Sequence, residues 1–262
     1  MRTDLGDARL PFVRAGAGPP LVFLHAGIAD MRMWEPQLAT FAQDHTVFAY
    51  DLRGYGRSES ADVEYAHHTD LARMLDAQDM DCVTLIGASI GGSAAIDFAL
   101  EQPERVEALV LVGAAVGGYE FSDAASIAAW DPIEAAHEAG DFELATELEL
   151  RFWVDGPKRR PEQVDTGFRR TVSAMLRPNI ERGELEQELE LDPPALDRLG
   201  EIDIPTLVIV GDEDVPDVQR TAEILAENIY EASSSRIGDS AHLPSLEHDT
   251  VFDRIVRIWM TQ

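Results

Sequence analysis

The 262-residue sequence holds a single cysteine, a single lysine and no long hydrophobic run. Because Cys82 is alone, the chain can form neither an internal disulfide nor a cysteine-based metal cluster, which suits a reducing cytoplasm. No stretch approaches the roughly 18 consecutive apolar residues of a membrane-spanning helix, so no membrane span is expected. The opening segment, MRTDLGDARLPF, has early acids and no apolar core, unlike a secretory signal. These absences predict a cytoplasmic protein.

Positive charge is scarce as well. The chain has 49 Asp and Glu residues against 21 Lys and Arg, and its formal net charge is -28. The acidic excess is spread along the chain, which is typical of a solvated acidic surface and not of a tail. Phosphate groups are bound by clustered Lys and Arg, so neither nucleic acid nor an anionic membrane is expected as a partner. Two interpretations of the acidity stay open: a high-salt environment, and an Arg-rich, high-GC genome.

The sequence is rich in apolar runs that alternate with helical patterns. Near-continuous apolar runs predict buried strands at 21–25, 47–51, 83–87, 108–113 and 206–211. Helical patterns lie between them, and an antiparallel edge strand, a weaker last strand and a closing helix are expected at 8–18, 233–237 and 251–260. This alternation predicts an α/β fold with a mostly parallel, doubly wound sheet.

Residues 118–200 interrupt the alternation. They are rich in Ala, Glu and Leu, show helical periodicity, and contain breaks at Gly140, Gly156-Pro157, Pro161 and Pro193-Pro194. We expect about four helices that form a lid inserted between two strands. The core would then comprise residues 1–117 and 201–262, because a chain of this length buries one large core more readily than two.

The segment CVTLIGASIGG (82–92) carries the strongest functional signal. A strand-like run, which we expect to bury Cys82, meets a helix-like stretch at a tight turn that holds Ser89. Glycines two residues before and after a serine in this setting are typical of a nucleophile elbow, in which Gly87 and Gly91 avoid clashes with neighbouring backbone. The turn therefore predicts a nucleophilic serine at the top of the sheet.

A serine nucleophile needs a base, and the base needs a carboxylate to orient it. In this architecture the acid and the histidine follow the serine in that order, each on a loop after a late strand. Asp214, after the run TLVIVG, and His242, after the run SSSRI, occupy these places. Asp212 is the main alternative to Asp214 as the acid, and Glu213 and Asp217 are also close by.

Attack on a carbonyl carbon builds an oxyanion that two backbone N–H groups must stabilise. The residue after the nucleophile, Ile90, supplies one of them. The loop after the first central strand, LHAGI (24–28), supplies the other, and Gly27 is preferred to Ile28 because a residue without a side chain lets the oxygen approach. His25 lies at the strand end, so we interpret it as a brace of this loop and not as a second base.

These motifs together resemble the α/β-hydrolase superfamily over nearly the whole chain. The oxyanion loop is His25-Ala26-Gly27, the segment Asp-x-Arg-Gly-x-Gly-x-Ser stands at 51–58, and the elbow, acid and histidine loops read GASIGG, GDEDVP and SAHLPSLE. The resemblance implies an α/β-hydrolase fold with a helical lid and a Ser89–His242–Asp214 triad, and it makes residues 51–58 a structural turn. No Gly-rich phosphate cradle, His-Glu-x-x-His motif or Cys/His cluster occurs, so neither a metal nor a cofactor is expected.

Within the superfamily, RMWEPQL (32–38) and the lid length are similar to 3-oxoadipate enol-lactonases and small bacterial carboxylesterases. The resemblance implies a serine hydrolase of this type, which acts on a small-molecule ester or lactone through an acyl-enzyme; a homodimer is left open. Two alternatives remain: a triad-bearing ligand receptor, and a carbon–carbon bond hydrolase or perhydrolase. The carbon–carbon hydrolases often carry an aromatic residue after the catalytic histidine, where this chain has Leu243.

Pocket-lining residues are harder to select. The lid candidates are Trp130, His137, Phe142, Phe152, Trp153 and Met175, with Arg151, Arg169 and Arg170 as possible partners of a substrate carboxylate. Each aromatic side chain also fits simple packing between helices, and each arginine also fits a surface salt bridge.

Overall fold

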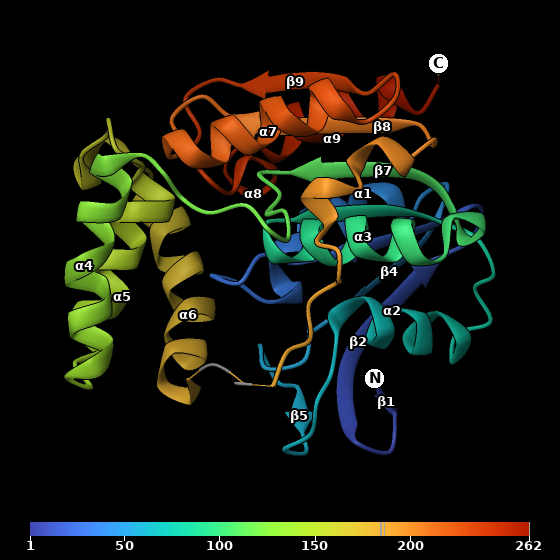
Figure 1. Ribbon diagram of the computed structural model, residues 1–262, viewed down its shortest axis with the longest axis horizontal. Coiled ribbons are helices and arrows are strands. Elements are labelled where there is room, and N and C mark those ends of the chain that lie inside the picture. Colours follow the sequence, from blue (N-terminus) through green and yellow to red (C-terminus); the bar gives the residue numbers. More distant parts are fainter. Residues whose placement is uncertain (184, 186, 262) are drawn as a thin grey trace.

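The computed structural model describes residues 1–183, 185 and 187–261, and these form a nine-stranded sheet flanked by helices (Figure 1). The strands are β1 (Arg2–Asp4), β2 (Ala8–Gly16), β3 (Pro20–Leu24), β4 (Thr46–Tyr50), β5 (Glu59–Ser60), β6 (Val83–Ala88), β7 (Val106–Val112), β8 (Thr206–Gly211) and β9 (Ser233–Ile237). Their order is β1-β2-β4-β3-β6-β7-β8-β9, with β5 paired to β2. Strands β4 to β9 of this order run parallel, and β1, β2 and β5 pair in antiparallel fashion.

The predicted α/β fold is confirmed, and the five apolar runs form β3, β4, β6, β7 and β8 with ends shifted by no more than two residues. Alternate side chains of each strand enter opposite faces of the sheet. In β3, Leu21 and Phe23 join one apolar cluster, whereas Val22 and Leu24 join the other. Because both faces are covered, these strands read as unbroken apolar runs and not as alternating ones.

Two layers of helices cover the sheet. Helices α2 (His67–Asp76), α3 (Ile90–Glu101) and α7 (Pro216–Asn228) pack on one face, and α1 (Glu35–Phe41) and α9 (Asp249–Trp259) pack on the other. The short helix α8 (Pro244–Glu247) leads into α9. Helix α9 was expected at 251–260, and its apolar side buries Phe252 and Val256.

The chain between β7 and β8 is helical, as predicted for residues 118–200. We call this part of the chain the insertion. It contains α4 (Ala124–Glu138), α5 (Phe142–Glu149), the π-helical segment η3 (Leu150–Asp155) and α6 (Thr166–Arg182). Figure 1 shows α4, α5 and α6 beyond one end of the sheet. Gly140 and Gly156, with φ of 66° and 73°, interrupt the helices where breaks were expected. Within the described chain the insertion has three α-helices instead of about four, because η3 continues α5 directly.

Three local expectations were wrong. Cys82 is exposed, because β6 begins only at Val83. The segment from Ala8 is not the edge of the sheet, because β1 pairs with its outer side. Four histidines outside the motifs were expected to be exposed helix or loop residues: His45, His67, His68 and His248. His67 is instead 3% exposed and packs against Tyr55 and Tyr65. No helix in the described ranges is long and apolar enough to cross a membrane.

Candidate active site

Ser89 lies at the turn between β6 and α3, in a backbone conformation that few residues adopt. Its φ is 52° and its ψ is -117°, which places a non-glycine residue in a strained region. A Cβ atom on Gly87 would lie 2.4 Å from the Gly91 carbonyl oxygen, and one on Gly91 would lie 2.4 Å from the Leu24 oxygen. The turn therefore requires both glycines, as predicted for a nucleophile elbow.

The end of β7 is a common neighbour of the elbow and of the two late loops. The main-chain N–H group of Ser89 donates to the carbonyl oxygen of Val112 at 3.0 Å, and the main-chain carbonyl oxygen of Ser89 accepts the N–H group of Ala115 at 3.1 Å. Between them, a Cβ on Gly113 would lie 3.3 Å from Nδ1 of His242 and 3.4 Å from Oδ2 of Asp214. The main chain of Ser89 and the side chains of His242 and Asp214 thus all lie next to the segment that follows β7.

Asp214 and His242 form a buried pair. Oδ2 of Asp214 lies 2.9 Å from Nδ1 of His242, and the two side chains are 0% and 2% exposed. Oδ1 of Asp214 accepts the N–H group of Val215 at 2.8 Å, which fixes the carboxylate plane. This arrangement leaves Nε2 as the ring nitrogen available to a nucleophile.

The alternative acids contact other groups. Asp212 accepts the N–H group of Asp239 at 2.9 Å, and Asp217 accepts the Tyr119 hydroxyl at 3.0 Å. Asp214 is therefore the acid of this loop that faces the histidine. The Ser89 hydroxyl makes no hydrogen bond to another described residue, and such contacts often tighten only when a substrate is bound.

The insertion packs directly on the histidine. The ring centroids of Trp153 and His242 lie 4.5 Å apart. The main-chain N–H group of His242 also donates to the carbonyl oxygen of Trp153 at 3.1 Å. A Cβ on Gly156 would lie 2.1 Å from the Glu213 oxygen, so the chain after η3 presses against the acid loop as well. Trp153 thus covers one face of the imidazole, and π-helical segments such as η3 are frequent at functional sites.

His25 braces the loop after β3, as predicted. Its Nδ1 lies 2.9 Å from the Ala26 oxygen, and its Nε2 accepts the N–H group of Leu52 at 2.9 Å. These partners require the proton on Nδ1. Burial lowers the pKa of His25, which keeps the ring neutral and in this tautomer.

The loop after β3 and the start of α3 offer free donors to an oxyanion. The N–H groups of Gly27, Ile28 and Ile90, the first residue of α3, have no acceptor within the described chain. A Cβ on Gly27 would lie 3.8 Å from Cγ2 of Ile90. The two predicted donors, on Gly27 and Ile90, therefore belong to neighbouring residues.

The segment 51–58 has a structural role. The Asp51 carboxylate accepts the N–H groups of Met31 and Arg57 at 3.1 and 2.8 Å. Arg53 is fully buried and pairs with Asp70 at 2.7 Å. Through its bond to Met31, Asp51 fixes the start of η1 (Met31–Trp34), and therefore also the end of the loop that contains Gly27.

The lid candidates fall into two groups. Trp130, Phe152 and Trp153 form a cluster of edge-to-face rings, whereas Met175 is buried in an apolar cluster and His137 pairs with Glu149 at 2.7 Å. Of the arginines, Arg151 pairs with Glu147 and Arg169 pairs with Asp155 and Glu147, which is the salt-bridge interpretation. Two residues that sequence analysis missed, Arg159 and Asn179, connect the insertion to the site loops.

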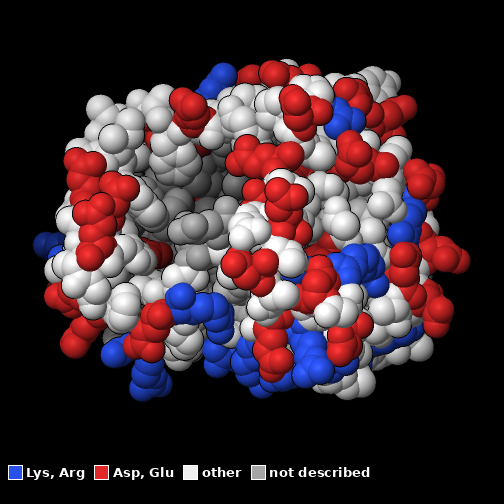
Figure 2. Space-filling model, turned by 60° about the horizontal axis from the view of Figure 1, so that its bottom comes forward, with Lys and Arg blue, Asp and Glu red and all other residues white. Residues whose placement is uncertain are grey.

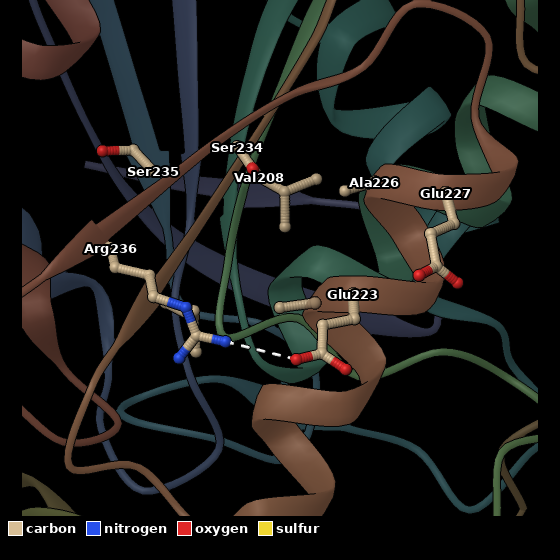
Figure 3. A pocket seen from close by; sticks show the side chains of 9 residues that line it. Val208, Glu223, Ala226, Glu227, Ser234, Ser235 and Arg236 are labelled. Carbon is tan, nitrogen blue, oxygen red and sulfur yellow. Dashed lines mark hydrogen bonds and ion pairs between the residues drawn. The ribbon is translucent and has the colours of Figure 1, made fainter.

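A cavity of about 320 Å³ lies between α4, η3 and the start of α7. It is mostly apolar, and its walls include Ala129, Pro132, Leu148, Phe152, Val215 and Pro216. Val215 directly follows the acid of the buried pair. A smaller cavity of about 180 Å³ lies between α7 and β9, where Arg236 pairs with Glu223 (Figure 3). Figure 2 shows a hollow beside the insertion and acidic side chains spread over the face in view.

Comparison with known proteins identifies the class that this fold and site define. The profile of the alpha/beta hydrolase family matches residues 21–254, so the chain belongs to this family. A 2-hydroxymuconate semialdehyde hydrolase from a Pseudomonas species is 34% identical over 122 residues, which is 44% of this chain and 41% of the relative. The chain spans less than half the length of the curated relatives it matches.

Solved structures agree over the full length. Est816, described as an N-acyl homoserine lactone degrading enzyme, has a TM-score of 0.76 and 25% identity, with 98% of this chain and 99% of that chain covered. The enol-lactonase from Burkholderia xenovorans has a TM-score of 0.78 and 19% identity, with both chains covered completely. At that identity the second match shows the shared fold alone.

Proposed function

We propose that the protein is a serine hydrolase that cleaves an ester or lactone of a small organic acid. The observation that carries the proposal is the buried His242–Asp214 pair, 2.9 Å apart. The pair lies beside Gly113, in the segment after β7 whose Val112 and Ala115 form hydrogen bonds with the main chain of Ser89. A histidine oriented in this way serves as the base of a nucleophilic serine. The neighbour Est816, which is described as a lactone-degrading enzyme, supports this substrate class.

In the proposed reaction, Oγ of Ser89 attacks the substrate carbonyl carbon while Nε2 of His242 takes its proton. Asp214 accepts the Nδ1–H group, holds the tautomer and stabilises the imidazolium. The N–H groups of Gly27 and Ile90 receive the oxyanion. The tetrahedral intermediate expels the alkoxide, which takes the proton from His242. A water molecule, deprotonated by the same histidine, then attacks the acyl-enzyme. The second tetrahedral intermediate releases the acid and Oγ of Ser89, which takes the proton back from His242.

The insertion is the proposed lid of this site, with residues 118–200 covering a core of 1–117 and 201–262. Trp153 supports this role, because it lies against the ring of His242. A ring over the imidazole excludes water from the pair and strengthens its electrostatic contacts. The apolar cavity beside Val215 would suit an uncharged part of the substrate.

The test is a panel of short acyl esters and lactones assayed with the wild type and Ser89→Ala. We expect the substitution to lower kcat by about 10⁴ or more. Turnover that is unchanged in Ser89→Ala would refute the serine mechanism. Faster turnover of lactones than of linear esters would narrow the substrate class.

A second candidate, hydrolysis of a carbon–carbon bond, is favoured by the relative named as a 2-hydroxymuconate semialdehyde hydrolase. Such a substrate and the esters can be compared directly in the same assay. A kcat/KM that is higher for 2-hydroxymuconate semialdehyde than for every ester and lactone would select the second candidate.

A further inference from the structure

Asn179, on α6 of the insertion, reaches across to the loop that carries Gly27. Its Nδ2 donates to the Ala29 oxygen at 2.9 Å and to the Gly27 oxygen at 3.4 Å, and its Oδ1 accepts the N–H group of Gly56 at 2.9 Å. The side chain is 8% exposed. These contacts join residues more than 120 positions apart, so they are a feature of the tertiary fold.

The partners dictate which end of the amide points where. A backbone N–H group can only donate and a carbonyl oxygen can only accept, so Oδ1 must face Gly56 and Nδ2 must face the loop. An aspartate of the same shape could still accept from Gly56. It would, however, turn an acceptor toward the oxygens of Gly27 and Ala29, which is repulsive.

Two peptide planes of this loop are held from opposite sides. The Ala26 oxygen shares a plane with the N–H group of Gly27, and the core holds that plane through Nδ1 of His25. The Gly27 oxygen shares the next plane with the N–H group of Ile28, and Asn179 holds that plane from the insertion. Without Asn179, the second plane could rotate and turn the Gly27 oxygen toward the place of the oxyanion.

We propose that Asn179 is a positioning residue of the oxyanion loop. The insertion then does more than cover the site: its Asn179 holds the Gly27 carbonyl away from the substrate and fixes the peptide plane that follows the Gly27 donor. The inference rests on the proposed serine-hydrolase function, because only an oxyanion gives the orientation of this loop a catalytic consequence.

The test compares Asn179→Asp and Asn179→Ala with the wild type on the best ester or lactone of the panel. We expect kcat to fall by roughly 10- to 100-fold, somewhat less than the loss of an oxyanion donor itself, while KM changes by less than about threefold. The affinity for a boronic acid, which forms a tetrahedral adduct on serine, should fall by the same factor as kcat/KM. The pH profile of kcat/KM should keep its shape, because His242 and Asp214 are untouched.

The matched control is Val172→Ala, on the same helix. Val172 is fully buried in an apolar cluster and has no side chain that can form a hydrogen bond, so the substitution loosens the packing of α6 but leaves the hydrogen bonds of Asn179 in place. We expect the control to lower the Tm like the Asn179 variants and to change kcat by less than about threefold. An equal kcat loss in the control would show that only packing is involved and would overturn the inference.

Different experimental results would refute the proposed hydrolase function and the proposed role of Asn179. If wild type and Ser89→Ala behave alike on the whole panel, the hydrolase function fails. If Ser89→Ala is inactive but a folded Asn179→Asp or Asn179→Ala keeps its kcat within twofold of wild type, only the role of Asn179 fails. Thermal unfolding of each variant establishes that it is folded, and Asn179→Ala serves if the added charge prevents Asn179→Asp from folding.

Discussion

Asp214 contacts the ring of His242, whereas the nearby Asp212 accepts a hydrogen bond from the main chain of Asp239. We predict that Asp214→Asn lowers kcat by about 10⁴, because the amide favours the wrong tautomer of His242. Asp212→Asn is the control, since its amide oxygen can still accept the N–H group of Asp239; its kcat should stay within threefold of wild type. Steady-state kinetics on both variants measures the difference. A larger loss of kcat in Asp212→Asn than in Asp214→Asn would identify Asp212 as the acid that orients His242.

Asp97, on α3, makes the second prediction for a single side chain. Burial raises its pKa to about 6, with added repulsion from Glu190 and Glu101, and its Oδ1 has no partner among the described residues. An acid with a raised pKa in the folded state costs stability above pH 6, and this cost disappears as the pH falls below the unfolded value of 3.8. Asp97→Asn should therefore stabilise the protein by about 1 to 2 kcal/mol at pH 7.5.

The same substitution should make much less difference at pH 4, where Asp97 is protonated in the folded state and close to half protonated in the unfolded state. Urea unfolding at the two pH values measures the effect, with Asp203→Asn as an exposed control. An Asp97→Asn gain of equal size at both pH values would show that charge is not the cause.

Single residues differ in how far sequence predicts them. Ser89, Asp214 and His242 follow strands and lie in short motifs, so their positions in the fold follow once the strands are recognised. Asn179 lies in a helix between Pro178 and Ile180, and its sequence context does not distinguish it from a solvent-facing side chain. Its partners, Gly27 and Ala29, are about 150 residues away, and only the packing of α6 against the core reveals them.

The connection between the insertion and the histidine loop makes a prediction for these two elements. Arg159 follows η3 and donates to the Val154, Asp155 and Asp239 oxygens. It also pairs with Glu247 at 2.7 Å, and both side chains are 9% exposed. Arg159→Gln leaves this carboxylate buried without its partner, so we expect a loss of about 3 kcal/mol in the free energy of unfolding.

Arg177→Gln on α6 is the matched control for this loss. Its pair with Glu181 is half exposed, so the expected cost is less than about 1 kcal/mol. Urea unfolding of the two variants compares them. Equal losses would mean that the Arg159 pair does not tie the insertion to the core.

Elements differ in predictability for a related reason. The central strands are covered on both faces, and their apolar runs mark them in the sequence. Strands β1 and β5 are short, lie at the edge and contain polar residues such as Arg2 and Glu59, which carry no strand signal. The π-helical segment η3 was also not predicted, since the contact of Trp153 with His242 is tertiary and invisible to local periodicity.

For the protein as a whole, the net charge of -28 predicts a response to salt. Acidic side chains spread over the surface repel one another, and salt screens this repulsion. We expect 1 M NaCl to raise the Tm by at least about 3 °C over low salt, equivalent to roughly 1 kcal/mol. Sucrose of equal osmolality controls for exclusion of solute from the surface. A Tm that does not change with salt would exclude adaptation to high salt and leave the Arg-rich genome as the explanation.

The central claim is that Ser89 is the nucleophile and His242 its base, and covalent labelling tests it most directly. The wild type, Ser89→Ala and His242→Gln are treated with a fluorophosphonate, and the intact mass and the modified peptide are measured. We predict one adduct, on Ser89, which is absent from Ser89→Ala and forms more than about 10³-fold more slowly in His242→Gln. An adduct on another residue, or labelling of Ser89 at an unchanged rate without the histidine, would contradict the mechanism.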